Sequence, residues 1–281
     1  MAVRRRVVAG RIPGVGTLKG GYVAETDSEA PSRSGALDRG LAILDHLATA
    51  REATVVEIAN AVDLSRSTTY RLMDRLREAG FAEPADEAGL WRLGPAAARL
   101  ATAAVQSNDV VHVAPDLLRL LVQQTRETVG LAVFNSGEMI FIYRERGPQP
   151  VTVSAQLGAR RPLHCTSVGK AYLSALPDTE ARALIRRLDL AEFTEHTITS
   201  RLQLEHEVAV TGRRGWSEDH REFDLRVTCC GAPILDRTGR PVAAISIAGP
   251  TERTEGTLHR LGPVVASTAE AISHRLGYQP R

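Results

Sequence analysis

The chain has little cysteine and no long apolar segment. It holds three cysteines, an odd number, and two of them, Cys229 and Cys230, are adjacent. A disulfide framework is therefore not expected, and a reducing cytoplasm fits best. No run of about 18 uncharged apolar residues occurs, which excludes a membrane-spanning helix. The first residues are basic but lack the apolar core of a secretory signal.

The sequence contains two lysines, Lys19 and Lys170, so arginine carries the positive charge. The formal net charge of +2 says almost nothing about partners. Hydrophobic residues make up 43% of the chain, which is ordinary for a globular protein and argues against wholesale disorder. The length of 281 residues predicts roughly two domains.

Signatures of metal and nucleotide sites are also missing. The sequence contains no CxxC or HxxxH spacing typical of zinc ligands. It contains no phosphate-binding GxxxxGK motif, and its early glycines do not follow a predicted strand. We therefore expect no metal and no cofactor.

Residues 1–35 are basic, rich in Gly and Ser, and without helical or strand periodicity. They indicate a flexible basic arm, which could add non-specific attraction to phosphates. An ordinary disordered leader is the alternative. It is favoured, because chain termini are commonly disordered.

Residues 36–94 predict three helices followed by a hairpin. Leucines at three- and four-residue steps form one face of a first helix: Leu37, Leu41, Leu44 and Leu47. A short helix over 55–62 follows, and Ser65 is a plausible N-cap for a third helix ending at Gly80. Strands over 81–83 and 90–93 then flank a tip at 86–89. This order is typical of a winged helix-turn-helix.

The third helix suits DNA recognition. With Leu72, Met73 and Leu76 turned inward, a polar set faces outward at helical spacing. We expect contacts to bases or phosphates from Arg66, Ser67, Thr68, Tyr70, Arg71 and Arg75, and a wing contact from Arg92. The alternative is a solvated helix face, because residues 36–94 carry seven arginines against ten acidic residues.

A helical linker is predicted over 95–128, made of an Ala-rich helix to about Gln106 and a second helix from about Val113. Residues 129–281 form the second domain. Apolar segments flanking Asn135-Ser136-Gly137 indicate a hairpin, and residues 151–153 could add a strand. Further helices are expected over 167–175, 178–188, 202–212 and 255–276, with strands over 227–235 and 242–248. This mixture predicts an α+β domain with an antiparallel sheet.

Several dispersed motifs resemble the IclR family of bacterial transcriptional regulators. In the first domain they are SGALDRGLAILD at 34–45, LSRSTTYRL at 64–72, EAGF at 78–81 and WRLG at 91–94. In the second domain they are PLHCTSVGKA at 162–171, RGW at 214–216 and AISIAGP at 244–250. The resemblance covers about residues 35–276. It implies a DNA-binding domain joined to a GAF-like effector-binding domain, and homodimers or tetramers on a palindromic double-stranded operator.

The resemblance also implies a pocket for a small organic acid. The motif containing His164, Ser167, Val168 and Gly169 would begin a helix, where free N–H groups and the helix dipole favour an anion. Spacing alone would favour a simple helix cap, and the family match reverses that preference. By motif alignment, the polar contacts around the effector are Asp219, Cys229 and Ser246.

Three departures from the family pattern affect this pocket. His220 and Arg221 stand where further acidic residues are common, Ala248 replaces a second serine, and Thr228 replaces an arginine. They suggest a larger or more apolar acid, with Trp216 and Phe223 as candidate aromatic neighbours.

Two rival functions remain. A small hydrolase would use Cys165 or Cys229, but no complete catalytic constellation is evident, and buried cysteine is more often an apolar filler. An architectural DNA-binding protein would use its second domain for oligomerisation only. A ligand-controlled regulator is the hypothesis that we carry forward, and the family resemblance implies that it is a repressor.

Overall fold

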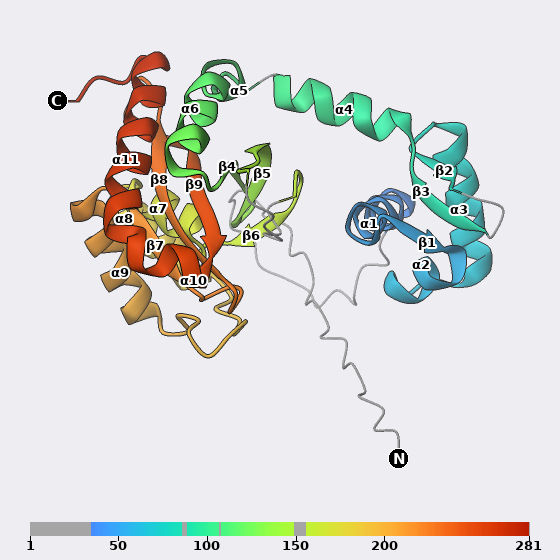
Figure 1. Cartoon of the computed structure of the whole chain (residues 1–281). Helices are drawn as coiled ribbons and strands as arrows, with labels where there is room; N and C mark the ends of the chain where they lie inside the picture. Colours follow the sequence, from blue (N-terminus) through green and yellow to red (C-terminus); the bar gives the residue numbers. More distant parts are fainter. Residues whose placement is uncertain (1–34, 86–88, 107, 149–155, 281) are drawn as a thin grey trace, which may run out of the picture.

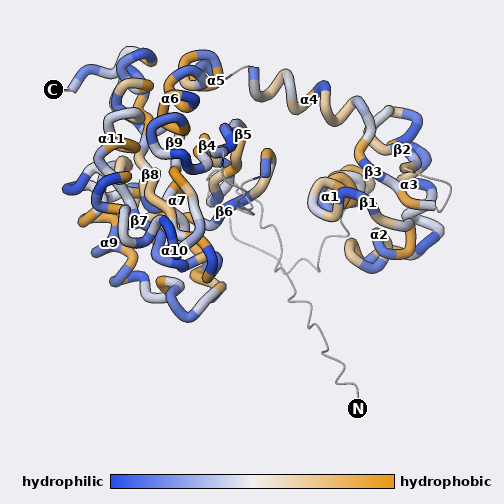
Figure 2. Tube along the Cα trace, viewed as in Figure 1, coloured by the Kyte–Doolittle hydropathy of each residue, from blue (hydrophilic) through white to orange (hydrophobic). Residues whose placement is uncertain are grey.

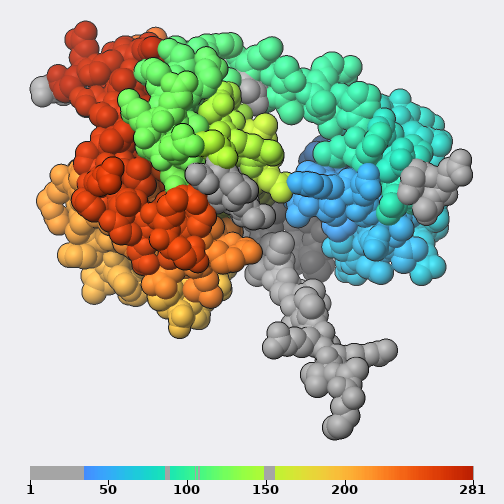
Figure 3. All heavy atoms as spheres, viewed as in Figure 1, coloured from blue at the N-terminus to red at the C-terminus, as the bar shows by residue number. Residues whose placement is uncertain are grey.

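The computed structural model describes residues 35–85, 89–106, 108–148 and 156–280. Two lobes are joined by the helix α4 (Figures 1 and 3). The predicted arm, the wing tip at 86–88 and the strand at 151–153 lie outside the described residues. The α+β architecture predicted from the sequence is confirmed.

The N-terminal lobe has the element order of a winged helix-turn-helix. Its elements are α1 (Ala36–Ala50), β1 (Glu52–Thr54), α2 (Val55–Ala61), α3 (Arg66–Glu78), β2 (Ala82–Pro84) and β3 (Leu90–Leu93). The strands form one antiparallel sheet in the order β1-β3-β2. Strand β1 was not predicted, because three residues are too few to show a period of two.

Side-chain caps fix where the two helices of the motif begin. Thr54 and Glu57 form a capping box at the start of α2. The Ser65 hydroxyl accepts a bond from the Thr68 N–H and begins α3, as the sequence predicts. Gly80 follows α3 with φ of 74°, a conformation that favours glycine.

The first helix buries less than its leucine pattern predicts. Ile43 and Leu47 are fully buried with Met73 of α3, whereas Leu37 is 74% exposed and Leu41 is 56% exposed. No described part of the chain covers the half of α1 that carries Leu37 and Leu41.

The linker region divides into three helices: α4 (Pro95–Gln106), α5 (Val110–Val113) and α6 (Pro115–Thr125). Helix α4 is exposed along most of its length, including Leu100. In Figure 2 its tube alternates between apolar and polar colours. Helix α6, by contrast, buries Leu118 and Leu121 in the core of the C-terminal lobe.

The C-terminal lobe is a six-stranded antiparallel sheet, ordered β6-β5-β4-β9-β8-β7, between two helical layers. The strands are β4 (Thr128–Asn135), β5 (Glu138–Glu145), β6 (Arg160–Pro162), β7 (Ser217–His220), β8 (Val227–Leu235) and β9 (Pro241–Pro250). The helices are α7 (Ser167–Ser174), α8 (Asp178–Arg187), α9 (Arg201–Arg214), α10 (Thr251–Thr254) and α11 (Leu258–Arg275), with a 3-10 turn at Glu255–Thr257.

Alternation along the central strands separates two cores. In β9, Ile245 and Ile247 pack with α6 and α11, while Ala244 packs with the layer that contains α7. Ser246 therefore points to the α7 side. Strands β6 and β7 lie at the two edges of the sheet, and neither was predicted.

Candidate functional site

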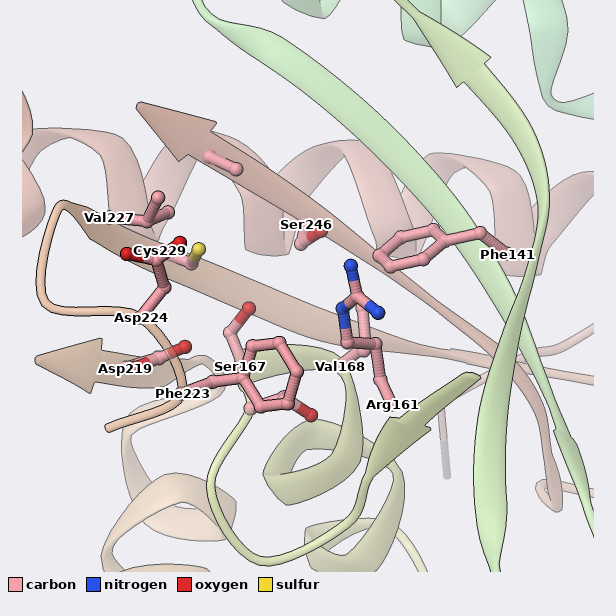
Figure 4. A pocket seen from close by; sticks show the side chains of 12 residues that line it. Phe141, Arg161, Ser167, Val168, Asp219, Phe223, Asp224, Val227, Cys229 and Ser246 are labelled. Carbon is pink, nitrogen blue, oxygen red and sulfur yellow. The ribbon is translucent and has the colours of Figure 1, made fainter. Parts of the chain in front are cut away.

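The floor of a pocket is set by strand register. Asp219 of β7 pairs with Cys229 of β8, and Cys229 pairs with Ala248 of β9. Residues directly opposite each other in an antiparallel sheet share a face. The next row on the same face of the sheet pairs Gly231 with Ser246. The two rows bring one carboxyl, one thiol and one hydroxyl to the same side (Figure 4).

The start of α7 forms one wall. The Thr166 hydroxyl accepts a bond from the Gly169 N–H and donates to the Pro162 carbonyl, which fixes the first turn. Ser167 and Val168 of this turn line the pocket. A Cβ at Gly231 would lie 3.1 Å from the carbonyl oxygen of Ser167. Glycine thus lets α7 approach the sheet closely.

Arg161 brings a cation into this pocket, and the sequence interpretation missed it. Its guanidinium carbon lies 4.8 Å from the ring centroid of Phe223 and 5.8 Å from that of Phe141. In Figure 4 the guanidinium points into the pocket toward Ser246. Its place directly before the Pro162 motif was the available signal, but a neighbour in sequence does not show which way a side chain points.

The carboxyl of Asp219 is held at the back of the pocket. Burial raises its pKa to about 7, with a further contribution from Glu222. The Glu222 N–H donates a 2.8 Å hydrogen bond to Oδ1 of Asp219. Glu222 in turn contacts Lys170: Nζ of Lys170 lies 2.5 Å from Oε1 of Glu222, and Lys170 is 1% exposed. The pocket therefore faces a carboxyl that readily carries a proton.

The thiols of this lobe are poor nucleophiles. Burial raises the pKa of Cys229 and of Cys165 well above the usual range, and the Asp219 charge adds to both shifts. Burial likewise raises the pKa of Cys230 to about 12. A thiol held protonated cannot supply the thiolate that covalent catalysis needs.

The pocket as a whole is small and mostly apolar, and encloses about 50 Å³. Its lining is Phe141, Arg161, Thr166, Ser167, Val168, Asp219, Phe223, Asp224, Val227, Cys229, Ser246 and Ala248. A bound organic molecule therefore requires some outward movement of the rim. Phe223 lies at that rim, and its ring also contacts Phe193 at 4.9 Å between centroids.

Five of the seven predicted pocket residues meet here: Ser167, Val168, Asp219, Cys229 and Ser246. His164 does not line the pocket, because its ring turns away and Nε2 lies 3.0 Å from the Ala191 carbonyl. Gly169 is also set back, since a Cβ there would overlap the backbone of Leu163. Trp216 packs against Gly262 of α11 instead, while Phe223 lines the pocket as expected.

Helix α3 presents the polar face that the sequence predicts. Arg66, Ser67, Tyr70 and Arg71 are exposed, while Thr69 and Met73 are buried. Arg66 and Arg71 have no ion-pair partner among the residues that the structure describes.

The other predicted contact residues are engaged within the protein. Arg75 pairs with Glu78 at 3.0 Å. Arg92 of β3 pairs with Glu83 of β2 at 2.8 Å. Thr68 is half-buried and receives a hydrogen bond from Ser65.

Neither a membrane-spanning helix nor a metal site is found in the described ranges. No helix there is both long and apolar enough to cross a bilayer. The same ranges contain no cluster of three or more His, Cys, Asp or Glu side chains able to hold a metal ion.

Two family descriptions match the chain. Residues 36–86 match the IclR helix-turn-helix domain, and residues 102–274 match the C-terminal domain of bacterial IclR transcriptional regulators.

Individual proteins give the same result. The acetate operon repressor of Salmonella typhimurium is 31% identical over 92% of this chain and 96% of its own length. The solved structure of Thermotoga maritima IclR superposes with a TM-score of 0.70 at 29% identity, covering 86% of this chain and 98% of that one. An IclR homolog from Microbacterium hydrocarbonoxydans, solved in complex with 4-hydroxybenzoate, shares the fold with a TM-score of 0.72 at 24% identity, over 86% of this chain and 99% of its own.

Proposed function

The chain belongs to the IclR family of bacterial transcriptional regulators, and from that premise we propose that it is a repressor whose operator binding is controlled by a small carboxylic acid. The observation that carries the proposal is the pocket of the C-terminal lobe. It combines one arginine, one helix N-terminus and aromatic walls in a largely apolar space. The regulator would act in the cytoplasm, where its DNA lies.

A carboxylate fits this pocket better than a neutral or cationic ligand. The guanidinium of Arg161 donates from Nη1 to the Arg160 carbonyl at 2.8 Å, and it has the planar donor geometry that matches a carboxylate. The first-turn N–H groups of α7, at Ser167 and Val168, add the positive end of the helix dipole. Asp219 accepts a carboxylate as a neighbour only when it holds a proton, and its raised pKa makes that state accessible near neutral pH.

Phe141, Phe223 and Val227 would contact the body of the acid. The replacement of a serine by Ala248 leaves this wall apolar. An acid with an aromatic or branched aliphatic body would therefore bury more apolar surface here than a short polar acid.

For DNA, we assign the major-groove contacts to the exposed face of α3. Arg66, Ser67 and Thr68 lie in its first turn, where base contacts of this motif concentrate. Arg71 and Tyr70 lie one turn later and suit phosphates. Arg75 and Arg92 would have to exchange their acidic partners for phosphates, so they rank lower.

A homodimer is the assembly that suits both lobes. Leu37 and Leu41 of α1 and Leu100 of α4 are each more than half exposed, although all three are large apolar side chains. A second copy would cover them and would place two α3 helices at successive major-groove faces.

The rival hydrolase is disfavoured by the thiols, whose raised pKa values oppose nucleophilic attack. The rival architectural protein predicts that no small molecule changes operator affinity. The test uses full-length protein and an operator selected from random duplex DNA. Carboxylic acids are first screened for a rise in melting temperature, because a ligand selective for the native state stabilises it.

Acids that stabilise the protein are then titrated into the DNA complex by fluorescence anisotropy. We expect release of DNA by at least one acid, and loss of that response in Ser246→Ala with DNA binding intact. Ser267→Ala, on the exposed face of α11, is the matched control. Stabilisation by acids without any change in DNA affinity would favour the architectural protein, and no selected operator at all would contradict both.

A further inference from the structure

A second cavity, of about 260 Å³, lies along the β7 edge of the larger sheet and shares no residue with the effector pocket. Its walls come from α9, β7, the turn that follows β7, and the loop that precedes α9. Strand alternation accounts for the separation: Asp219 lines the effector pocket, whereas Glu218 and His220 on either side of it line the second cavity.

Buried polar atoms without partners gather around this cavity. Seven buried side-chain nitrogen or oxygen atoms in the described residues lack a hydrogen bond, and four of them belong to its walls. These four are Nε2 of His196, Nη2 of Arg214, Nε of Arg221 and Oε2 of Glu222. Glu222 is only 5% exposed. Polar atoms left unpaired in a buried site are costly, so the cavity calls for a polar occupant.

The open groups define the chemistry of that occupant. Glu218 is already saturated, because Arg214, Trp216 and His220 all donate to it at 2.8 to 3.2 Å. The four open atoms are two arginine donors, one carboxylate oxygen and Nε2 of His196, which lies 3.7 Å from Oε1 of Glu195. Arg221 also pairs with Glu255 through Nη2, at 3.4 Å, and its Nε stays open.

A second carboxylate, Glu207, lies 3.8 Å from Arg214 and 3.9 Å from Lys170. It opposes a ligand with two negative charges. A ligand with one anionic and one cationic end satisfies both kinds of open group.

We propose that this cavity is a second ligand site, for a small α-amino-acid-like zwitterion whose carboxylate meets Arg214 and Arg221 and whose ammonium group meets Glu222. The volume suits a small molecule rather than a drug-sized one. His220 and Arg221, which depart from the acidic pattern of the family, both line it. The turn that carries them is fixed by bonds from Thr194 to the Arg221 carbonyl and from Thr197 to the Glu222 carbonyl.

The second site is connected to the effector pocket through two hydrogen bonds of one residue. Glu222 donates its N–H to Asp219 and accepts from Lys170, which lies on α7. An ammonium group beside Glu222 would offset the negative charge that raises the pKa of Asp219. Asp219 would then ionise more readily and repel a carboxylate in the effector pocket. The zwitterion and the acid would therefore oppose each other, and linkage makes this effect reciprocal. This coupling rests on the proposed function, whereas the site itself does not.

The test uses the full-length protein and the twenty proteinogenic amino acids as individual probes in titration calorimetry. For each probe that binds, the corresponding acid without the amino group and the amine without the carboxylate serve as chemical controls. We expect the zwitterion to bind and each control to bind at least tenfold more weakly. Arg221→Gln and Glu222→Gln should each weaken binding at least tenfold, while Arg213→Gln, on the exposed side of α9, should not.

Glu222→Gln leaves the buried Lys170 without its closest partner and can fail to fold, so Arg221→Gln, at a half-exposed position, decides the matter alone if necessary. Absence of binding by every amino acid at millimolar concentration would mean that the cavity holds water only, and would overturn the proposal. If binding of a probe is lost in Arg161→Gln and not in Arg221→Gln, the probe occupies the effector pocket. That result would also overturn the proposal of a second site. Operator release by carboxylic acids is measured separately, so failure of the second site and failure of the proposed function give different results.

Discussion

The two lobes carry their functional side chains in opposite ways. In the N-terminal lobe most of them are exposed, and Arg66 and Arg71 have no ion-pair partner among the described residues. In the C-terminal lobe they are buried and share hydrogen bonds, as for Asp219, Lys170 and Glu222. A surface that reads DNA can change without loss of the fold, whereas a pocket that senses a ligand is part of the core that holds the lobe together.

Contacts between the lobes are weak by comparison. Arg160 of β6 lies 3.6 Å from Asp45 of α1, and both side chains are more than half exposed. Such a pair contributes about 0–1 kcal/mol. The lobes should therefore respond separately to most substitutions, and the four predictions below test that separation.

The largest effect is expected from Met73→Ala. Met73 is fully buried in the small core of the N-terminal lobe, and such a truncation costs about 2–5 kcal/mol. Hydrogen exchange should show early opening of this lobe alone, together with loss of DNA binding. Tyr70→Ala, at an exposed neighbour, should lower DNA affinity without early opening. Simultaneous opening of both lobes in Met73→Ala would contradict the claim that the two lobes respond separately to substitutions.

The next effect is the pH dependence of Asp219→Asn. Because the pKa of Asp219 is raised to about 7, the folded protein keeps a proton there that the unfolded chain loses at lower pH. Wild-type stability should fall as pH rises from about 4 to 7, by about 1.4 kcal/mol per pKa unit at most. The melting temperature of the Asn variant, relative to wild type, should be higher at pH 8 than at pH 5.

Asp224→Asn is the control of opposite sign. A hydrogen bond from Arg226 lowers the pKa of Asp224, so its contribution to stability is present above the unfolded pKa and is lost in acid. This variant should lose more stability at pH 8 than at low pH. Parallel behaviour of the two variants would show that the Asp219 carboxyl is not protonated by burial in the folded protein.

An intermediate effect is expected from Arg161→Gln. A charged hydrogen bond contributes about 1.5–3 kcal/mol, so the affinity for a stabilising carboxylic acid should fall about 10- to 100-fold. Calorimetry measures this, and DNA binding without the acid should be unchanged. Arg160→Gln, at the exposed neighbouring position of the same strand, should keep the affinity. Equal losses in both variants would remove Arg161 from the pocket assignment.

The smallest effect is expected from Arg71→Ala. Loss of one phosphate contact should weaken binding to all DNA sequences about equally and reduce the salt slope by about one. Anisotropy titrations at several salt concentrations measure both. Arg77→Ala is the control, because Arg77 of the same helix pairs with Asp74. An unchanged slope in Arg71→Ala would move Arg71 off the DNA-facing surface.

Local patterns predicted most of the fold. The hairpin of β4 and β5 follows from Asn135-Ser136-Gly137, and the structure gives Ser136 and Gly137 the positive φ that such a turn needs. The strand predicted over 227–235 has the bounds of β8. By contrast, β6 and β7 are edge strands of three and four residues and exist through pairing with distant strands. No period along the chain reveals them.

The candidate pocket was predicted in part for the same reason. Motifs located Ser167, Asp219, Cys229 and Ser246, but Arg161 enters the pocket because β6 pairs with β5 and turns that side chain toward Phe141. His164 carried the right chemistry in the right motif, yet tertiary structure commits its ring to the Ala191 carbonyl. Residue type and spacing do not encode these directions.

Because α4 is a helix, the number of residues in it sets both the position and the orientation of the N-terminal lobe. Its 12 residues span about 18 Å, and each inserted residue would advance the N-terminal lobe about 1.5 Å and rotate it about 100°. One extra residue would thus swing α3 away from its groove, whereas three or four would restore its phase. Insertions and deletions in this segment are therefore constrained more by the rotation of the N-terminal lobe than by the change in distance between the lobes.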